Sequence, residues 1–313
     1  MKASDPLDQM NERFQCKGRR SSPVMNLFKH AIRWIALLCV LALFSAEAQF
    51  RNGGRSRRNF ETNNPERIKE QEMMEKALNP EFREDVFTFA RLKFTEADRG
   101  FRFGGGRLWD DDAPEADLNL IFRLHEVTSL KVRPGLNFID ITTKELANYP
   151  FVYLAASGKV VFTDQEVADL RQYLLNGGFL MADDFWGDEQ WAHFHDQMKR
   201  LFPDREPEEL SLDHRIFHTV IDFKQESQIP SVGAYIHTGE SFDPGFPFDL
   251  KNSDPHYYAL YDDKKRMMAL LCHNNHYGDG WEHEGDEITY FTKFSERGAY
   301  PMFINILVYT MTH

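Results

Sequence analysis

The hydrophobic positions along the chain fall into short runs that predict strands. Residues 86–94, VFTFARLKF, and 136–142, LNFIDIT, alternate apolar and polar side chains, as half-buried strands do. Residues 151–158, FVYLAASG, and 179–184, FLMADD, are nearly continuous apolar runs with branched and aromatic side chains. Such runs are typical of strands buried on both faces, and residues 266–273, RMMALLCH, predict another.

Segments with helical spacing lie between these runs. Apolar residues recur near helical spacing over 115–130, a further helix is predicted over 188–203, and 303–312 is an apolar closing helix. A shorter helix is predicted over 67–78, because this segment contains mostly strong helix formers.

The helix that begins after Thr163 has the clearest boundaries. Thr163 and Glu166 form a capping box, in which each side chain accepts the backbone amide of the other residue. Asn176-Gly177 supplies the left-handed residue that ends many helices. Because strands and helices alternate from residue 86 to about residue 200, the sequence predicts an α/β fold with a mostly parallel sheet.

The composition supports a globular protein with an acidic surface. Of the 313 residues, 42% are hydrophobic and 14% aromatic, which is enough for a sizeable core. The net charge is −12, and it becomes −15 without residues 1–48, which contain seven basic and four acidic residues. An excess of negative charge argues against nucleic acid and anionic membranes as main partners.

Residues 25–48 have the pattern of a secretory signal peptide. Lys29 and Arg33 supply a positive n-region, residues 34–44 are apolar, and Ala46-Glu47-Ala48 is a small-x-small cleavage signal. The apolar run is short compared with the roughly 20 residues of a spanning helix. We therefore predict export to the periplasm or the extracellular space, with an uncleaved membrane anchor as the alternative.

This pattern sets the predicted domain boundaries. Residues 1–48 form the signal segment, with Met25 as a candidate true start, and residues 49–83 form a basic linker with a short helix. The folded domain covers 84–313, with no membrane span in the mature chain. Only Cys272 remains after cleavage, so no intramolecular disulfide can form, and its apolar surroundings favour a packing role.

Four sequence blocks point to a known family. FTDQEVADLRQYLLNGGFLMADDFWG, LSLDHRIFH, YGDGWE and FINILVYTMT, in this order and spacing, resemble the bacterial family catalogued as domain of unknown function 4159. The resemblance covers roughly residues 84–312. That family is similar in fold to class I glutamine amidotransferase-like domains, so the resemblance implies a flavodoxin-like α/β sandwich. It implies no activity.

The same resemblance indicates where a site would lie. Amidotransferase-like domains carry a nucleophilic cysteine on a sharp elbow after a strand, and the matching stretch here is GGFLMADDFWG, residues 177–187. Asp183 and Asp184 occupy that position, and the stretch contains no Cys, Ser or Thr. A carboxylate is a much weaker nucleophile than a thiolate towards an amide. We therefore predict that the protein is not a cysteine-dependent amidotransferase.

Asp183 and Asp184 are the central candidates, because they follow a predicted parallel strand at the edge where α/β sheets bind ligands. Neighbouring residues on a strand point to opposite faces, so both carboxylates reach the crevice only if the chain turns at Asp184. One interpretation is a site for a divalent metal or a hydroxyl-rich ligand, with Trp186 as an apolar platform. The alternative is that Asp184 or Asp188 caps the next helix.

Other candidates lie elsewhere in the chain. Asp279, Trp281 and Glu282 in YGDGWE are expected on a loop that reaches the crevice. Trp109, after a glycine-rich stretch, either stacks on a sugar ring or packs, and Ser157 lies where its backbone amide could hold an anion.

Histidines supply candidates for metal binding and proton transfer. His273 and His276, together with Asp184, are weak candidates for metal ligands, because H-x2-H alone is not a zinc signature. His214, with Asp213 beside it, is a candidate general acid or base, or it caps a turn.

The leading prediction is an exported, non-covalent binding module with an acidic crevice for a small polar ligand or an envelope protein. The alternative is a hydrolase that uses paired carboxylates or a divalent metal. Its mechanism requires Asp184, His214 and Glu282 to converge on one substrate atom. A third possibility is a structural component of an envelope complex.

Overall fold

The computed structural model describes residues 65–78, 86–95, 107–226, 228–239, 243, 253–285 and 287–313. The predicted signal segment, residues 49–64 of the linker, Gly104–Gly106 and most of the stretch 241–256, whose prolines indicate a loop, lie outside the described residues. Within the described part, no helix has both the length and the apolar character to cross a membrane.

The described strands form one sheet, which is seven-stranded and mostly parallel. Its order is β2-β1-β3-β4-β7-β6-β5, with parallel pairing from β2 to β7 and antiparallel pairing of β6 with β7 and of β5 with β6. The prediction of an α/β fold is confirmed. The strands are β1 (Arg91–Lys93), β2 (Phe138–Asp140), β3 (Phe151–Leu154), β4 (Phe179–Ala182), β5 (Glu208–Glu209), β6 (His256–Tyr261) and β7 (Met267–His273).

The predicted helices are present, and others join them. The α-helices are α2 (Pro65–Ala77), α3 (Glu115–Val127), α4 (Asp164–Leu175), α5 (Gly187–Leu201), α6 (Val232–Thr238), α7 (Tyr277–Glu282), α8 (Ile288–Tyr290) and α9 (Tyr300–Thr312). Shorter turns are η2 (Leu108–Asp110), η3 (Lys144–Asn148), η4 (Ser157–Lys159) and η5 (Arg215–His218), and η6 (Phe291–Ala299) is a π-helix. The sequence patterns did not predict α6, α7, β5 or β6.

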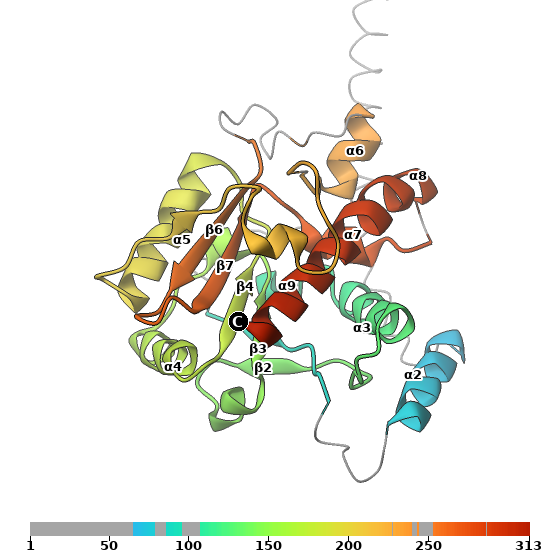
Figure 1. The fold of residues 1–313 in the computed structure, drawn as a ribbon, viewed down its shortest axis with the longest axis horizontal. Coiled ribbons are helices and arrows are strands. Elements are labelled where there is room, and N and C mark those ends of the chain that lie inside the picture. Colours follow the sequence, from blue (N-terminus) through green and yellow to red (C-terminus); the bar gives the residue numbers. More distant parts are fainter. Residues whose placement is uncertain are drawn as a thin grey trace, which may run out of the picture. The chain divides into compact units, whose positions relative to one another are not determined.

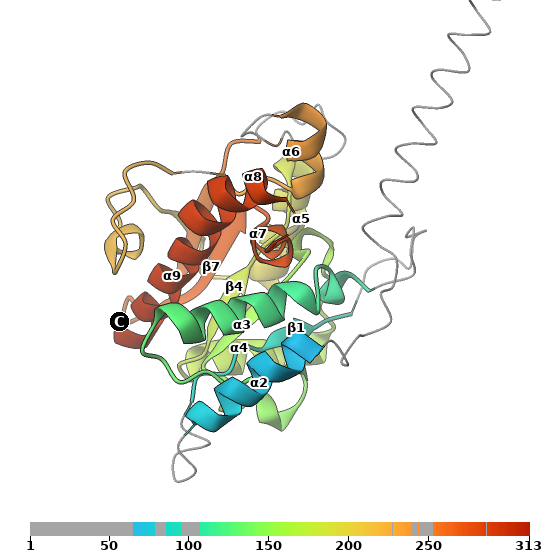
Figure 2. The same ribbon diagram turned by 90° about the vertical axis from the view of Figure 1, so that its right-hand side faces the viewer.

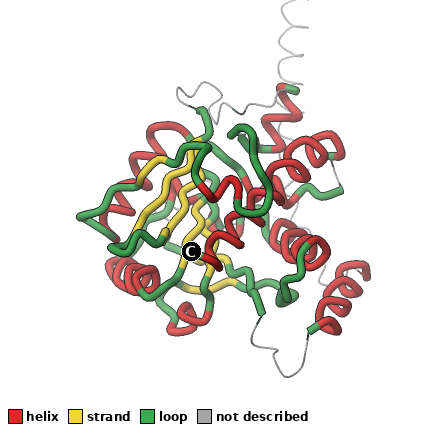
Figure 3. Tube along the Cα trace, in the orientation of Figure 1, coloured by secondary structure: helices red, strands yellow, loops and turns green. Residues whose placement is uncertain are grey.

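Helices cover both faces of the sheet, which explains the continuous apolar character of its central strands. Phe151 and Tyr153 of β3 belong to the core that includes α3, α7 and α9. Val152 and Leu154 point to the opposite face, into the core beneath α4 and α5. Figures 1 and 2 show these two groups of helices on either side of the strands, and Figure 3 separates helices from strands by colour.

The first predicted strand is shorter than expected. Phe87 pairs through its backbone with Lys131 and Arg133, and the Arg91 amide donates to the Asn137 carbonyl. Gly135, whose φ is +93°, lies between Arg133 and Asn137, so the neighbouring chain turns away there and the ladder of backbone hydrogen bonds is interrupted.

The capping box predicted at the start of α4 is confirmed, and the helix ends in a Schellman motif. The Gly178 amide donates to the Tyr173 carbonyl at 3.0 Å, and the Gly177 amide donates to the Leu174 carbonyl at 3.3 Å. Gly177 has φ +110°, which only glycine adopts without strain. This turn directs the chain into β4 and so places the residues that follow it.

Two alanine substitutions test this turn. We expect Gly177→Ala to lower the free energy of unfolding by about 1 kcal/mol, because the new side chain meets no atom but strains the backbone. We expect Gly178→Ala to cost more, about 2–3 kcal/mol, because its Cβ overlaps the buried ring of Tyr173. Urea denaturation measures both. Equal costs would contradict this description of the turn.

Candidate functional site

The chain turns sharply after β4. Asp184 has φ +54°, a left-handed conformation, so the strand does not continue and its carboxylate is not forced to the face opposite Asp183. The amide and the hydroxyl of Ser157 both donate to the Asp183 carbonyl, at 3.1 and 3.0 Å. The chain therefore does turn at Asp184, as is needed for both carboxylates to reach the same site. Ser157, the first residue of η4, stabilises this turn.

The Asp183 carboxylate is fully buried and joins three elements. Its Oδ2 accepts hydrogen bonds from the Tyr153 hydroxyl at 2.9 Å, the Tyr277 amide at 2.7 Å and the Gly278 amide at 3.2 Å. Its Oδ1 has no hydrogen-bond partner among the described residues. Burial is the largest effect on this group and raises the pKa of Asp183 to about 7. This side chain fixes the first turn of α7 against the ends of β3 and β4.

The stretch expected to be a loop is the helix α7, and it begins at a histidine. His276 is the N-cap residue, and its Nδ1 accepts the Asp279 amide at 3.1 Å. One turn on, Asp279 Oδ2 accepts the Val232 amide at 2.8 Å, which ties α7 to the start of α6. Helical spacing therefore places the Asp279 carboxylate beside the imidazole.

A carboxylate from a distant part of the chain joins this group. Asp112, with φ +64°, places its Oδ2 3.7 Å from His276 Nδ1. That oxygen is buried without a hydrogen-bond partner in the described structure, and the side chain is only 9% exposed. A Cβ at position 278 would overlap this oxygen, so the arrangement requires Gly278.

The segment that carries Asp112 is held by a buried ion pair. Arg91 Nε donates to both carboxylate oxygens of Asp117, at 3.1 and 3.2 Å. Its Nη1 donates to the carbonyl of Asp111 at 2.6 Å, and the guanidinium lies 5.0 Å from the centre of the Tyr153 ring. Arg91 therefore fixes the backbone next to Asp112.

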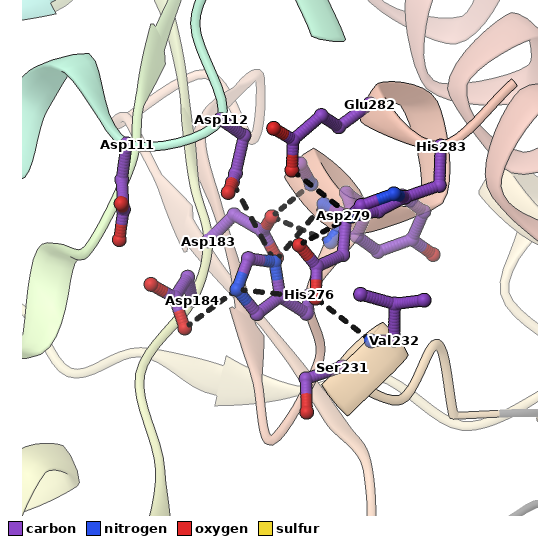
Figure 4. Close-up of polar contacts among 12 residues, drawn as sticks. Asp111, Asp112, Asp183, Asp184, Ser231, Val232, His276, Asp279, Glu282 and His283 are labelled. Atoms are coloured by element: carbon purple, nitrogen blue, oxygen red, sulfur yellow. Dashed lines mark hydrogen bonds and ion pairs between the residues drawn. The ribbon is translucent and has the colours of Figure 1, made fainter. Parts of the chain in front are cut away.

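The result is one imidazole surrounded by carboxylates, as Figure 4 shows. His276 Nε2 lies 3.6 Å from Asp184 Oδ1 and 3.9 Å from Asp279 Oδ2. Burial lowers the pKa of His276, but the carboxylates of Asp184, Asp279 and Asp112 outweigh it and raise that pKa well above its usual value. Burial likewise raises the pKa values of Asp112 and Asp279.

These separations suit a shared cation better than direct hydrogen bonds. Each exceeds hydrogen-bond length, whereas bonds of about 2.0–2.6 Å to one ion place two ligand atoms roughly 3–5 Å apart. Ligand atoms of Asp112, His276 and Asp279 all lie within 4.8 Å of one another, and so do those of Asp279, Glu282 and His283. The geometry therefore offers two overlapping groups of metal ligands.

Of the residues proposed from the sequence, Asp183, Asp184, His276, Asp279 and Glu282 belong to this region. Asp112 and Arg91 were not among the candidates from the sequence, although the three consecutive aspartates at 110–112 were a signal for the first. His283, one of the histidines and carboxylates over 272–287 that could bind a metal, also lies in this region.

The structure assigns structural roles to three residues that were proposed to bind ligands. Trp186 is not an open platform, because it is 8% exposed and its indole Nε1 donates to Asp184 Oδ1 at 2.9 Å. Trp281 is fully buried, with its ring edge-to-face against Phe89 and Phe303. Ser157 uses both its donors on the Asp183 carbonyl.

The Trp109 side chain packs against the edge strand β2. Its ring packs edge-to-face on Phe138 of β2, and Lys93 lies 5.8 Å from the ring centre. Packing, one of the two roles left open for Trp109, is the one that the structure shows.

The capping role left open for Asp184 is not seen, because Asn274 Oδ1 accepts the first amide of α5, from Gly187, at 2.8 Å.

The expectation that His273 ligates a metal with Asp184 is not met. The His273 ring stacks on Phe185 at 5.1 Å between centres, and its Nε2 lies 3.1 Å from the Gly187 carbonyl. His273 therefore belongs to an aromatic stack beside α5, where burial lowers its pKa to about 4. Cys272 is buried and free, as its apolar surroundings predicted.

His214 lies at the amino ends of the central strands, whereas the aspartates lie at the carboxyl ends. Its Nε2 is 3.3 Å from the Tyr261 hydroxyl, its Nδ1 accepts the Ile216 amide, and its ring faces Tyr309. Tyr261 pairs with Met267, the first residue of β7. At about 3.3 Å per residue, the amino ends are about 20 Å from the carboxyl ends of the strands. A mechanism that combines His214 with Asp184 and Glu282 is therefore wrong.

The fold and the site define an α/β domain with a buried cluster of carboxylates and histidines at the carboxyl edge of a parallel sheet. The chain belongs to the family described as Domain of unknown function (DUF4159), whose model matches residues 88–311. No curated protein matches the chain.

The buried position of His273 gives a pH dependence that can be isolated. Its folded pKa of about 4 lies below the ordinary value of 6.5, so the unfolded chain takes up the proton first as the pH falls. We expect the wild type to lose up to about 3 kcal/mol relative to His273→Phe between pH 7 and pH 4. Denaturation at several pH values measures this difference, and parallel curves for the two proteins would contradict it.

Proposed function

We propose that this domain binds a divalent metal cation through Asp112, His276 and Asp279, with Asp184 beside the ion. The observation that carries this proposal is the Oδ2 atom of Asp112, which is buried without a hydrogen-bond partner among the described residues and lies 3.7 Å from His276. A buried carboxylate oxygen in this situation costs free energy unless a proton or a cation compensates it.

The charges in the cluster support a cation. The carboxylates of Asp112, Asp183, Asp184 and Asp279 face one imidazole. If all four are ionised, a protonated His276 leaves negative charge unbalanced, and without a cation this charge is relieved only by protonation, as the raised pKa values of Asp112, Asp183 and Asp279 indicate. A divalent ion supplies the missing positive charge without further side chains. Because oxygen ligands predominate, with imidazole as the nitrogen ligand, Mn²⁺ and Mg²⁺ suit the group, and Zn²⁺ is a weaker match.

The burial of the ligands favours an ion over a larger molecule. The side chains of Asp112, His276 and Asp279 are exposed by only 9%, 11% and 11%. The sequence predicted a small polar ligand with Trp186 as an apolar platform. We propose instead a compact metal site in which Trp186 does not contact the ligand. The binding module remains our leading proposal over a hydrolase.

We also propose the finer fold assignment to the flavodoxin-like, amidotransferase-like class. Counted along the chain, the parallel strands of the sheet have the order 2-1-3-4-5, which is the flavodoxin order. Asp184, with its left-handed backbone between β4 and α5, corresponds to the elbow where relatives of this fold carry a cysteine. In this proposal the elbow carries a carboxylate next to a metal site.

Substitution of Asp112 tests the metal site against a neighbour. We expect the purified protein to bind Mn²⁺ in isothermal titration, and Asp112→Asn to weaken this binding at least tenfold, because the variant loses one charged ligand. Asp111→Asn is the matched control, since Figure 4 shows the Asp111 carboxylate set apart from His276, with no contact drawn between them. We expect the control to bind like the wild type.

Two results would contradict the metal proposal. One is the absence of bound Mn²⁺, Mg²⁺ and Zn²⁺ in the folded wild type, as measured by titration and by elemental analysis after dialysis. The other is equal weakening in Asp111→Asn and Asp112→Asn.

The proposed export has its own test. We propose that residues 25–48 direct secretion and that cleavage after Ala48 produces a mature chain beginning at Gln49. Expression with the complete N-terminal segment in a bacterial host, followed by N-terminal sequencing of the periplasmic fraction, is expected to give this terminus. An intact N-terminal segment on protein recovered from the membrane would favour the anchor instead.

A further inference from the structure

We propose that the site is a dinuclear centre, in which the carboxylate of Asp279 bridges the first cation and a second divalent cation bound by Glu282 and His283. This inference rests on the proposed function, because the first cation is the one held by Asp112 and His276. It adds a second ion, a bridging ligand and a stoichiometry.

The two oxygens of Asp279 face two different histidines. Oδ2 lies 3.9 Å from His276 Nε2, and Oδ1 lies 3.9 Å from His283 Nε2. Neither distance is a hydrogen bond, and both allow one ion to lie between the oxygen and the nitrogen. A carboxylate whose oxygens point to separate imidazoles has the geometry of a bridge between two metals.

The second group of ligands comes from one face of one short helix and its end. Asp279, Glu282 and His283 follow the i, i+3, i+4 spacing that places helical side chains next to one another. Their ligand atoms lie within 4.8 Å of one another, and Glu282 Oε2 is 3.1 Å from His283 Nε2. Figure 4 shows Glu282 and His283 on the side of Asp279 that is farther from Asp184.

Both ends of α7 are fixed before any ion binds. At its start, the Asp183 carboxylate accepts the amides of Tyr277 and Gly278. At its end, Asn119 Nδ2 donates to the carbonyls of Trp281 at 2.7 Å and Glu282 at 3.1 Å. The helix that carries the bridge and both second-ion ligands is therefore held rigidly, as a preorganised metal site requires.

The balance of charge also favours two ions. Around His276 and His283 stand the carboxylates of Asp112, Asp183, Asp184, Asp279 and Glu282. One divalent ion compensates only part of this excess. The five carboxylates carry five negative charges when ionised, and two divalent ions compensate four of them. Glu282 and His283 are 24% and 21% exposed, so the second ion would keep water ligands.

Metal stoichiometry separates this inference from the proposed function. We expect equilibrium dialysis of the purified protein with Mn²⁺, followed by elemental analysis, to give two ions per chain. Two Mn²⁺ ions joined by a carboxylate are expected to give an exchange-coupled signal in electron paramagnetic resonance. Glu282→Gln and His283→Gln are each expected to retain one ion and lose that coupled signal.

The matched control is Glu296→Gln, which removes an exposed carboxylate on η6 outside the site and is expected to bind two ions. Circular dichroism verifies the fold of each variant. Because Glu282→Gln and His283→Gln each remove a ligand of the second ion, the test still holds if one of the two variants misfolds. A single bound Mn²⁺ in the wild type would overturn the dinuclear centre and leave the proposed function intact. No bound ion would overturn both, and two ions in both variants would overturn the ligands assigned here.

Discussion

The buried carboxylate of Asp183 is the interaction on which the site depends. By accepting the Tyr153 hydroxyl and two amides of α7, it joins β3, β4 and a helix that comes almost a hundred residues later in the chain. A buried carboxylate is costly unless it is hydrogen-bonded, and these three donors provide much of the compensation. Without them, α7 would lose its fixed position, and His276 and Asp279 would no longer meet Asp184.

A second buried charge, the Arg91 guanidinium, stabilises the segment that carries Asp112. Tyr153 contacts both Arg91 and Asp183. The hydroxyl of Tyr153 donates to Asp183, while the face of its ring lies 5.0 Å from the Arg91 guanidinium. Arg91 in turn pairs with Asp117 and binds the Asp111 carbonyl, beside Asp112. Breaking a buried ion pair by removing one partner is strongly destabilising, about 3–5 kcal/mol. The position of α7 and the position of the Asp112 segment are therefore coupled through one aromatic side chain, Tyr153, in the centre of the sheet.

The sequence predicted what depends on local pattern and missed what depends on distant contacts. The capping box of Thr163 and the glycine turn after α4 act within a few residues, and they located β4 and the carboxylates that follow it. Asp112 joins the site only through the tertiary position of its loop, which no periodicity reveals. The glycines of YGDGWE suggested a loop, but tertiary contacts of Asp183 and Asn119 fix those residues as a helix and direct Trp281 into the core.

The distribution of backbone strain favours a functional site over simple packing. Of the five non-glycine residues with left-handed backbone in the described part of the chain, four lie in segments that build or border the cluster: Asp112, Ala156, Asp184 and Asn274. Such conformations cost about 1–2 kcal/mol each, although Asp and Asn tolerate them best. They persist because surrounding contacts, such as the Trp186 indole on Asp184, over-determine them. At Asp112 and Asp184 the strained backbone directs a carboxylate towards His276, an arrangement that a core edge serving packing alone would not need.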